Sequence, residues 1–496
     1  MMRPIAIAGC LTAMSLVTGQ AVAQAPPLQD RILILGEVAP KSAAEIVDND
    51  WSIGTETIDR DFSTHAAWRE YLGPLGAKHA RLQSGWARTD VGGGVYDFAW
   101  LDPIVDDIIA QGVTPWMSLG YGNPAYDGGG TPQRDTDLPE GEGRAAWLAY
   151  VHALVTRYRG RIDAWELWNE PDLIEKFTAE EFGRFAAETA RVVKEADPEA
   201  YVIVAGYTGL SDDSRTYVVK SLEAFVAEGD PALADAVIFH AYAPNPDSIY
   251  ASVEPFRDAL HAVIPGLELR QGESGAPSLN QQTFALRNIW WTEESQAKFL
   301  LRRMLGDAAH RIPTSVFTLT DLHYPAAIET AASFAASSSQ RNAVFTMNTK
   351  GLLETRRYAP GTPNEDRTVV RMKVGYRAMQ SVTSIFDSRL QTVDGACTAS
   401  DAGVSAYTFK RDDGALVVAA WRSTDRPGEQ VQHQDVDIFC TGVTFMGETT
   451  YVDLLTSSAY RVLDLVRPTS NGMTLTAVPV YDSPVLVADR SLVEIW

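Results

Sequence analysis

The sequence predicts an α/β fold, a TIM barrel of eight strand-helix units, (β/α)8, followed by a C-terminal antiparallel β-sandwich. Between residues 51 and 387, short apolar runs alternate with longer amphipathic stretches, which is the pattern of parallel strands connected by helices. After residue 387 the pattern changes to short alternating strands separated by turns, which is typical of an antiparallel sheet. A chain of 496 residues also exceeds the usual size of one core, so two domains are expected.

Eight apolar runs provide the strands of the predicted barrel. Their residue ranges are 51–57, 78–82, 113–119, 164–168, 201–205, 236–240, 267–271 and 315–319. Amphipathic stretches such as 142–158, 179–195 and 293–310 predict helices between them. The stretch 326–340, rich in Ala and Ser, predicts a loop after the eighth strand, and the last barrel helix is expected at 371–386. Eight such units close a TIM barrel.

The remaining region, 388–496, provides the β-sandwich. Its strands are expected at 404–410, 415–421, 436–440, 449–453, 473–478 and 484–488. The sequence Asp412-Asp413-Gly414 between the first two predicts a hairpin turn. Residues 24–50 form an N-terminal segment, in which the apolar run 31–38 is a candidate for one further strand of the sandwich. Cys397 and Cys440 also lie in this region, and their spacing leaves two alternatives open, a disulfide and two buried free thiols.

Residues 1–23 predict a signal peptide. Arg3 precedes the apolar run 5–17, and Ala21-Val22-Ala23 is a small-residue cleavage site, so the mature chain is expected to begin near Gln24, in the periplasm or outside the cell. The alternative, a lipoprotein signal ending at Cys10, leaves an apolar core of only a few residues. No later segment approaches the roughly 20 apolar residues of a membrane helix, so no membrane partner is expected.

Charge and metal-ligand spacing exclude other classes of function. With 64 acidic and 42 basic residues the formal charge is −22, so nucleic acid is not expected as a partner. The sequence has no cluster of Cys and His with zinc-ligand spacing and no His-Glu-x-x-His, so neither a metal nor another cofactor is expected. A metal-dependent amidohydrolase is disfavoured because the first strand, 52–56, lacks a His-x-His pair.

Two glutamates follow predicted strands at the point where a barrel places its active site. Glu170 ends the aromatic run Trp165-Glu166-Leu167-Trp168-Asn169-Glu170, and Glu273 lies in Gly272-Glu273-Ser274-Gly275 at the end of the seventh strand. Two carboxylates that flank one glycosidic bond can donate a proton and attack the sugar. The alternative for Asn169-Glu170-Pro171 is a simple strand-to-helix turn, because Asn and Pro both favour turns.

These motifs resemble clan A of the glycoside hydrolases over residues 51–387. The form Trp168-Asn169-Glu170-Pro171-Asp172, with a signal peptide and a C-terminal β-domain, is most similar to family 39 and its relatives. The resemblance implies a retaining glycosidase in which Glu170 is the acid/base and Glu273 the nucleophile. It also implies an oligosaccharide, polysaccharide or glycoside substrate, with a β-linkage as the family-level expectation.

The resemblance implies further site residues. Arg81, at the end of the second strand, is expected to bond the nucleophile, and Tyr242 to contact Glu273. Asn169 is expected to bond the sugar hydroxyl beside the reacting carbon, and His240 to form the wall of the site. The alternatives are a surface salt bridge for Arg81 and a buried structural role for His240.

Aromatic side chains near strand ends are candidates for stacking on sugar rings, although most aromatic residues of a barrel belong to its core. Trp86 and Tyr121 are the favoured platforms, and the other candidates are Trp116, Trp168, Trp290 and Trp291. Many clan members have a Trp at the end of the eighth strand. This chain has Asp321 and His323 there instead, and these are expected to make polar contacts to the sugar. A uronide would need basic residues, for which Arg81 and Arg270 are the candidates.

A second hypothesis is a catalytically silent carbohydrate-binding protein that keeps a glycosidase-like cleft. It is disfavoured because both carboxylates and their expected partners are present. The sugar and its linkage, exo or endo action, and the oligomeric state all stay open.

Overall fold

The computed structural model describes residues 31–133, 136–324, 347–356 and 367–496. The predicted signal peptide (1–23) and the predicted loop 326–340 lie outside the described residues. Within the described ranges, no helix combines the length and the apolar character that crossing a membrane requires.

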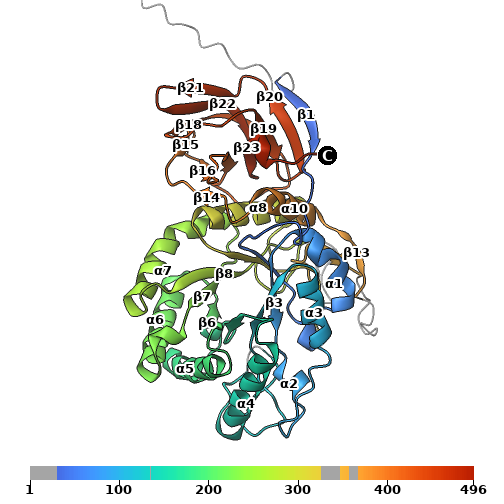
Figure 1. Ribbon diagram of the computed structural model, residues 1–496, viewed down its shortest axis with the longest axis vertical. Coiled ribbons are helices and arrows are strands. Elements are labelled where there is room, and N and C mark those ends of the chain that lie inside the picture. Colours follow the sequence, from blue (N-terminus) through green and yellow to red (C-terminus); the bar gives the residue numbers. More distant parts are fainter. Residues whose placement is uncertain (1–30, 134–135, 325–346, 357–366) are drawn as a thin grey trace, which may run out of the picture.

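Eight parallel strands close into a barrel, as the sequence predicts (Figure 1). They are β2 (Trp51–Gly54), β3 (His79–Gln83), β4 (Thr114–Ser118), β5 (Ala164–Glu166), β6 (Tyr201–Tyr207), β7 (Ala236–His240), β8 (Glu268–Ser274) and β9 (Thr314–Val316). The register of β2 with both β3 and β9 completes the closure. These strands are buried on both faces, because helices cover the outside and side chains fill the interior.

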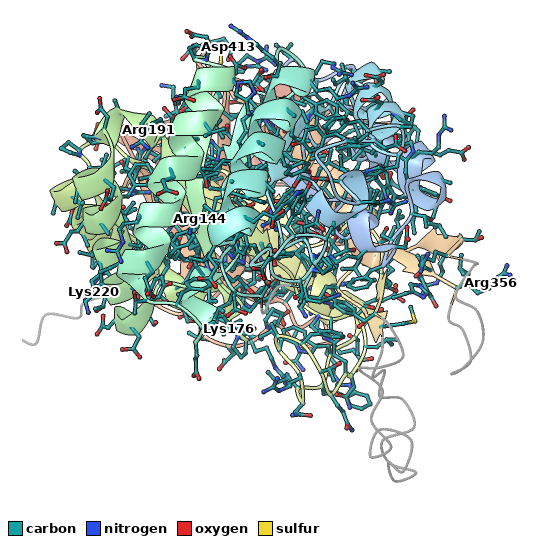
Figure 2. The ribbon with its side chains drawn as sticks, turned by 90° about the horizontal axis from the view of Figure 1, so that it is seen from below. Arg144, Lys176, Arg191, Lys220, Arg356 and Asp413 are labelled. Atoms are coloured by element: carbon teal, nitrogen blue, oxygen red, sulfur yellow. A yellow bond between two sulfur atoms is a disulfide. The ribbon has the colours of Figure 1, made fainter. Side chains whose placement is uncertain are left out.

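Helices cover the barrel between the strands. They are α1 (His65–Leu72), α2 (Trp86–Thr89), α3 (Asp102–Ala110), α4 (Gly141–Tyr158), α5 (Ala179–Ala196), α6 (Asp212–Glu228), α7 (Tyr250–Val263), α8 (Glu293–Ala309) and α10 (Val374–Ile385). Helix α5 begins with a capping box, in which Thr178 and Glu181 satisfy each other's backbone N–H groups. Charged residues such as Arg144 and Arg191 mark the outward side of α4 and α5 (Figure 2).

The last predicted helix begins three residues too early. Residues 369–372 form strand β13 (Val369–Met372), which pairs with β12 (Leu353–Thr355), and α10 starts only at Val374. Alternation of polar and apolar residues over such a short stretch does not separate the end of a strand from the start of a helix.

The C-terminal region forms two antiparallel sheets. One has the order β1-β20-β19-β23-β17-β16-β14 and the other β15-β18-β22-β21. The strands are β14 (Gln391–Thr392), β15 (Cys397–Ala399), β16 (Val404–Lys410), β17 (Leu416–Arg422), β18 (Gln434–Thr441), β19 (Thr449–Asp453), β20 (Ser458–Val462), β21 (Val466–Thr469), β22 (Gly472–Val480) and β23 (Val485–Asp489). The N-terminal strand β1 (Ile32–Glu37) pairs with β20 (Figure 1), and the amide of Trp496 donates to the carbonyl of Glu37, so the first and last described segments lie side by side.

Cys397 and Cys440 are opposite each other on β15 and β18 and form a disulfide with an S–S length of 2.06 Å. Of the two alternatives that the sequence leaves open, the structure therefore has the disulfide.

The sandwich is stacked on α8 and α10, along the long axis of the molecule (Figure 1). Buried polar contacts hold this seam together. Lys298 Nζ lies 2.8 Å from Asp482 Oδ1, and Arg302 Nε donates to Asp247 Oδ2 at 2.7 Å. Trp421 Nε1 of the sandwich donates to the other oxygen of Asp247 at 2.8 Å. The sandwich and the barrel are thus joined by buried hydrogen bonds and an ion pair.

Candidate active site

Glu170 and Glu273 meet at the carboxyl-terminal end of the barrel. Glu273 lies in β8, and Glu170 follows β5 at the start of a 3-10 helix, Pro171–Leu173. One carboxylate oxygen of each glutamate and one ring nitrogen of His240 lie within 4.8 Å of one another. The side chains of Glu170 and Glu273 keep 13% and 12% exposure, so both reach solvent.

The backbone of Glu170 is in the left-handed region, with φ at 51°. That conformation is uncommon for a residue with a Cβ, and such residues are concentrated at functional sites. The amide of Glu170 donates to the carbonyl of Gly206 at 2.6 Å, which holds the chain in this position beside β6.

Two glycines make room for the His240 ring. A Cβ on Gly206 would lie 2.6 Å from His240 Nε2, and one on Gly272 would lie 3.2 Å from the same atom. His240 is fully buried, and its Nδ1 lies 3.1 Å from Glu170 Oε1. The added Cβ at Gly272 would also clash with Ile238 Cγ2, so this glycine accommodates both Ile238 and His240.

Arg81, at the centre of the site, joins four side chains. Its guanidinium donates through Nε and Nη2 to Glu166 at 2.9 and 2.8 Å, and through Nη1 to Glu56 at 3.2 Å. Nη1 also donates to Glu273 Oε1, and Nη2 to Asn169 Oδ1 at 2.9 Å. Arg81 is fully buried, so the alternative of a surface salt bridge is wrong.

The sequence interpretation missed two acids of this cluster, Glu56 and Glu166. Both are no more than 1% exposed. Burial raises the pKa of Glu56 to about 7; Arg81 lowers it and Glu273 raises it further. Burial likewise raises the pKa of Glu166, against the opposing effect of Arg81. An acid inside an apolar barrel strand was the available signal, because a buried carboxylate needs a cationic partner.

Tyr242 and Asn169 lie where the resemblance places them. Tyr242 donates its hydroxyl hydrogen to Glu273 Oε2 at 3.0 Å. Asn169 Nδ2 donates to the hydroxyl oxygen of Tyr121 at 3.0 Å, while its Oδ1 accepts from Arg81. The amide orientation of Asn169 is thus fixed from both sides. The roles of these residues toward a sugar stay predictions.

The expectation that Trp86 and Tyr121 are sugar platforms is wrong. Trp86 is fully buried and packs against other aromatic rings, including Trp147 and Tyr150. Tyr121 is 4% exposed, and its ring meets Trp168 edge-on, so its hydroxyl rather than its face serves the site. Short aromatic segments after strands look alike in sequence whether they fold into the core or over the cleft.

The expectation that Trp116 stacks on a sugar ring is also wrong. Its ring lies inside the barrel, 5.4 Å from the Arg81 guanidinium carbon, and its Nε1 donates to Ser52 Oγ at 2.9 Å. It lines a cavity of about 230 Å³ at the amino-terminal mouth of the barrel, together with Arg270. Arg270 is therefore at the wrong end to bind a sugar carboxylate.

Asp321 and His323 make their contacts within the protein. Asp321 Oδ1 accepts from Lys373 Nζ at 2.6 Å, and His323 Nε2 lies 2.6 Å from Thr355 Oγ1. Both are no more than 3% exposed, so the expected contacts to a sugar are not supported. Of the other aromatic candidates, Trp168 and Trp291 are buried, and Trp290 is 60% exposed.

Aromatic residues from other loops form a cluster beyond the end of the eighth strand. Tyr324 lies 4.7 Å from Phe62 and 4.5 Å from Phe284, measured between ring centroids. The guanidinium of Arg60 lies over Phe62 at 5.1 Å and over Tyr121 at 5.2 Å. None of these contacts was predicted, because the residues come from three different loops.

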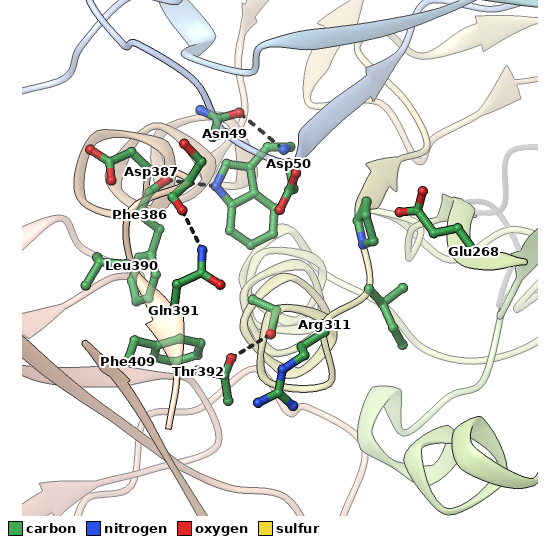
Figure 3. A pocket seen from close by; sticks show the side chains of 15 residues that line it. Asn49, Asp50, Glu268, Arg311, Phe386, Asp387, Leu390, Gln391, Thr392 and Phe409 are labelled. Atoms are coloured by element: carbon green, nitrogen blue, oxygen red, sulfur yellow. Dashed lines mark hydrogen bonds between the residues drawn. The ribbon is translucent and has the colours of Figure 1, made fainter. Parts of the chain in front are cut away.

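A further pocket lies away from the two glutamates, where the amino-terminal end of the barrel meets the sandwich (Figure 3). Its volume is about 290 Å³, and Asp50, Glu268 and Arg311 line it together with Phe386 and Phe409. Barrel enzymes place their chemistry at the opposite end, so the glutamate pair defines the candidate site.

The comparisons with known proteins agree with this geometry. A sequence model described as "Glycosyl hydrolases family 39" matches residues 81–262, which include Arg81, Glu170, His240 and Tyr242. The chain resembles the family 39 glycosyl hydrolases.

Solved structures with a similar fold cover nearly the whole chain. A family 39 glycoside hydrolase from Bacteroides cellulosilyticus WH2 has a TM-score of 0.60 at 16% identity, covering 91% of this chain and 83% of that one. The GH39 enzyme from Xanthomonas axonopodis pv. citri has a TM-score of 0.53 at 18% identity, covering 92% and 96%.

Sequence relatives match shorter stretches of this family 39-like chain. An intracellular exo-alpha-(1->5)-L-arabinofuranosidase from Streptomyces lividans is 25% identical over 247 residues, covering 48% of this chain and 36% of that protein. A beta-xylosidase from Geobacillus stearothermophilus is 28% identical over 134 residues, covering 24% of this chain and 26% of that protein. The chain thus spans about a third or less of the length of these curated relatives.

Proposed function

We propose that this chain is a retaining glycoside hydrolase with Glu170 as acid/base and Glu273 as nucleophile. The observation that carries the proposal is the spacing of the pair, because one oxygen of each carboxylate lies within 4.8 Å of the other. Retaining glycosidases hold their carboxyl groups about 5 to 5.5 Å apart, whereas inverting enzymes leave a wider gap for water.

The surroundings of the two glutamates support different roles. Glu273 accepts hydrogen bonds from Arg81 on one oxygen and Tyr242 on the other, which stabilises a carboxylate that is ready to attack. Glu170 lies next to His240, through which a proton can be held or exchanged. Different environments separate the pKa values of two carboxyl groups, so that one can be a proton donor and the other an ionised nucleophile at the same pH.

In the first step Glu273 forms a bond to the anomeric carbon while the bond from that carbon to the leaving oxygen breaks. Glu170 gives its proton to the leaving oxygen. In the second step Glu170 takes a proton from water, the water oxygen bonds the anomeric carbon, and Glu273 leaves as a carboxylate. Asn169, held between Arg81 and Tyr121, is placed to bond the neighbouring sugar hydroxyl.

The names of the relatives suggest a pentose. The arabinofuranosidases are named for an alpha-linked arabinofuranoside and the xylosidase for a beta-linked xyloside, so we propose one of these pentosides as the glycone. A β-linkage and export through the signal peptide remain part of the proposal. No metal is assigned to Glu170, His240 and Glu273, because the proposed chemistry uses the two carboxylates directly.

The test is hydrolysis of a panel of aryl arabinofuranosides, xylosides and uronides by wild type, Glu170→Ala and Glu273→Ala. Removal of a positioned acid or base costs about 10²- to 10⁴-fold, so both variants should lose at least that factor on the substrate that wild type cleaves. Glu223→Ala, on the exposed side of α6, is the matched control and should keep wild-type rates. Sugar binding without any hydrolysis would favour the carbohydrate-binding alternative instead.

A further inference from the structure

Lys350 is a buried lysine beside the proposed nucleophile. It follows β11 (Met347–Asn348), and its side chain faces Gly275, two residues after Glu273. Only 2% of Lys350 is exposed. Its ammonium lies 5.4 Å from the centre of the Tyr242 ring, the same tyrosine that donates to Glu273.

The Lys350 ammonium has few hydrogen-bond partners. It has three N–H groups, yet within the described residues it donates one hydrogen bond, to Asn348 Oδ1 at 3.3 Å. The other buried lysines differ in this respect, because Lys298 is paired with Asp482 at 2.8 Å and Lys373 with Asp321 at 2.6 Å. A buried cation without a carboxylate in contact is costly, and such groups are concentrated at functional sites.

The charge of the site explains what this cation can do. Arg81 is shared among three carboxylates, and Glu166 takes two of its hydrogen bonds while Glu273 takes one. One guanidinium therefore faces Glu56, Glu166 and Glu273 together. Lys350 is a second cation near these carboxylates, and its ammonium lies over the ring of Tyr242, which donates to Glu273.

We propose that Lys350 is a positioning residue whose positive charge offsets the surplus of carboxylates and holds the Glu273 carboxylate, together with Tyr242, in its attacking position. Its catalytic consequence rests on the proposed function. Lys350 acts by electrostatic attraction on Glu273 and by its contact with the Tyr242 ring. It takes no part in making or breaking bonds.

The protonation of Lys350 gives this role a pH dependence. Burial lowers the pKa of Lys350 to about 7, although the nearby charge of Glu273 acts to raise it. Glu273 on β8 is the charged group that faces it, Tyr242 is the titratable group beneath it, and Asn348 is its hydrogen-bond partner. Lys350 is thus protonated below a pH of about 7, and its charge is lost as the pH rises through that value.

The kinetic test uses a dinitrophenyl glycoside of the sugar that wild type cleaves, because this leaving group needs no proton from Glu170. For wild type, kcat/KM should fall as the pH rises through about 7. Lys350→Met should be at least about 10-fold slower at pH 6 without that fall, and Lys350→Arg should keep the rate and also lose the fall. Lys220→Met, on the exposed surface of α6 (Figure 2), should match wild type. A Lys350→Met variant with the wild-type profile, or one in which only KM rises, would overturn the proposal.

A second measurement needs no turnover. In protein labelled with ¹³C at lysine Cε, the resonance that Lys350→Arg removes belongs to Lys350. Its titration midpoint should lie near 7 and move to lower pH in Glu273→Gln, because the carboxylate that favours the ammonium is gone. A midpoint above about 9, as for an exposed lysine, or no response to Glu273→Gln would contradict the coupling. A protein that shows this coupling but cleaves no glycoside would refute the proposed function alone.

Discussion

At the scale of the residue, Arg81 fixes the positions of the acidic side chains in the site. All of its N–H groups donate to side chains of Glu56, Glu166, Glu273 and Asn169. A guanidinium suits this task because its donors lie in a fixed plane, and the resulting hydrogen bonds hold each acceptor in one orientation. The position of the Glu273 carboxylate is therefore set from inside the barrel.

Tyr242→Phe removes the hydrogen bond from the Tyr242 hydroxyl to Glu273 and keeps the aromatic ring. A hydrogen bond to a charged group contributes about 1.5 to 3 kcal/mol, so kcat/KM should fall about 10- to 100-fold while the melting temperature stays close to that of wild type. Steady-state kinetics and calorimetry check both statements. Tyr460→Phe, at the surface of the sandwich on β20, should change neither quantity. Unchanged kinetics in Tyr242→Phe would show that Arg81 alone positions Glu273.

At the scale of the element, the ends of β6, β7 and β8 make the space in which the site is built. His240 ends β7 and lies against two glycines, Gly206 in β6 and Gly272 in β8. Adjacent barrel strands are close together, and the missing Cβ atoms at Gly206 and Gly272 leave room for the imidazole between them.

Gly206→Ala should therefore disturb the site through a single methyl group. The added Cβ would lie 2.6 Å from His240 Nε2 and 2.7 Å from Glu166 Oε1, so the imidazole or the carboxylate must shift. Overpacking of this kind costs about 1 to 3 kcal/mol of unfolding free energy, and activity should fall because His240 loses its place beside Glu170. Gly447→Ala, whose added Cβ meets nothing within 4 Å, is the matched control. Denaturant unfolding gives the stability of the two variants, and steady-state kinetics give their activity. Equal stability and activity of Gly206→Ala and Gly447→Ala would contradict the predicted clash with His240.

At the scale of the whole molecule, the sandwich and the barrel form one unit. Lys298 of helix α8 pairs with Asp482 of the sandwich, and Arg302 of the same helix donates to the backbone carbonyls of Ser423 and Asp425. The disulfide of Cys397 and Cys440 fastens one sheet of the sandwich across a separation of 43 residues.

Reduction or replacement of this disulfide should destabilise the chain. Loop closure over such a separation is worth about 4 kcal/mol in the chain-entropy model, and measured values for disulfides are typically about 2 to 4 kcal/mol. The double variant Cys397→Ala/Cys440→Ala should therefore unfold at lower guanidinium concentration than wild type. Dithiothreitol should lower the midpoint of wild type and leave that of the double variant unchanged. An identical midpoint for both proteins would contradict a stabilising role.

The fold and the meeting of Glu170 with Glu273 could be predicted from the sequence because both depend on local patterns. The apolar runs mark the barrel strands, and Glu170 and Glu273 follow two of them. The rest depends on which loop folds over which strand. Trp86 and Trp116 belong to the core, and Lys350 comes to lie over the Tyr242 ring from a loop far along the chain. Neither outcome could be predicted from neighbouring residues in the sequence.

The most direct test of the account is azide rescue of Glu273→Ala, followed by NMR of the anomer that forms first. Wild type should release a sugar with retained configuration. Glu273→Ala should be inactive until azide enters the space of the missing carboxylate, and it should then release a glycosyl azide of inverted configuration. Inversion by the wild type, or full activity of Glu273→Ala without azide, would contradict the assignment of Glu273 as the nucleophile.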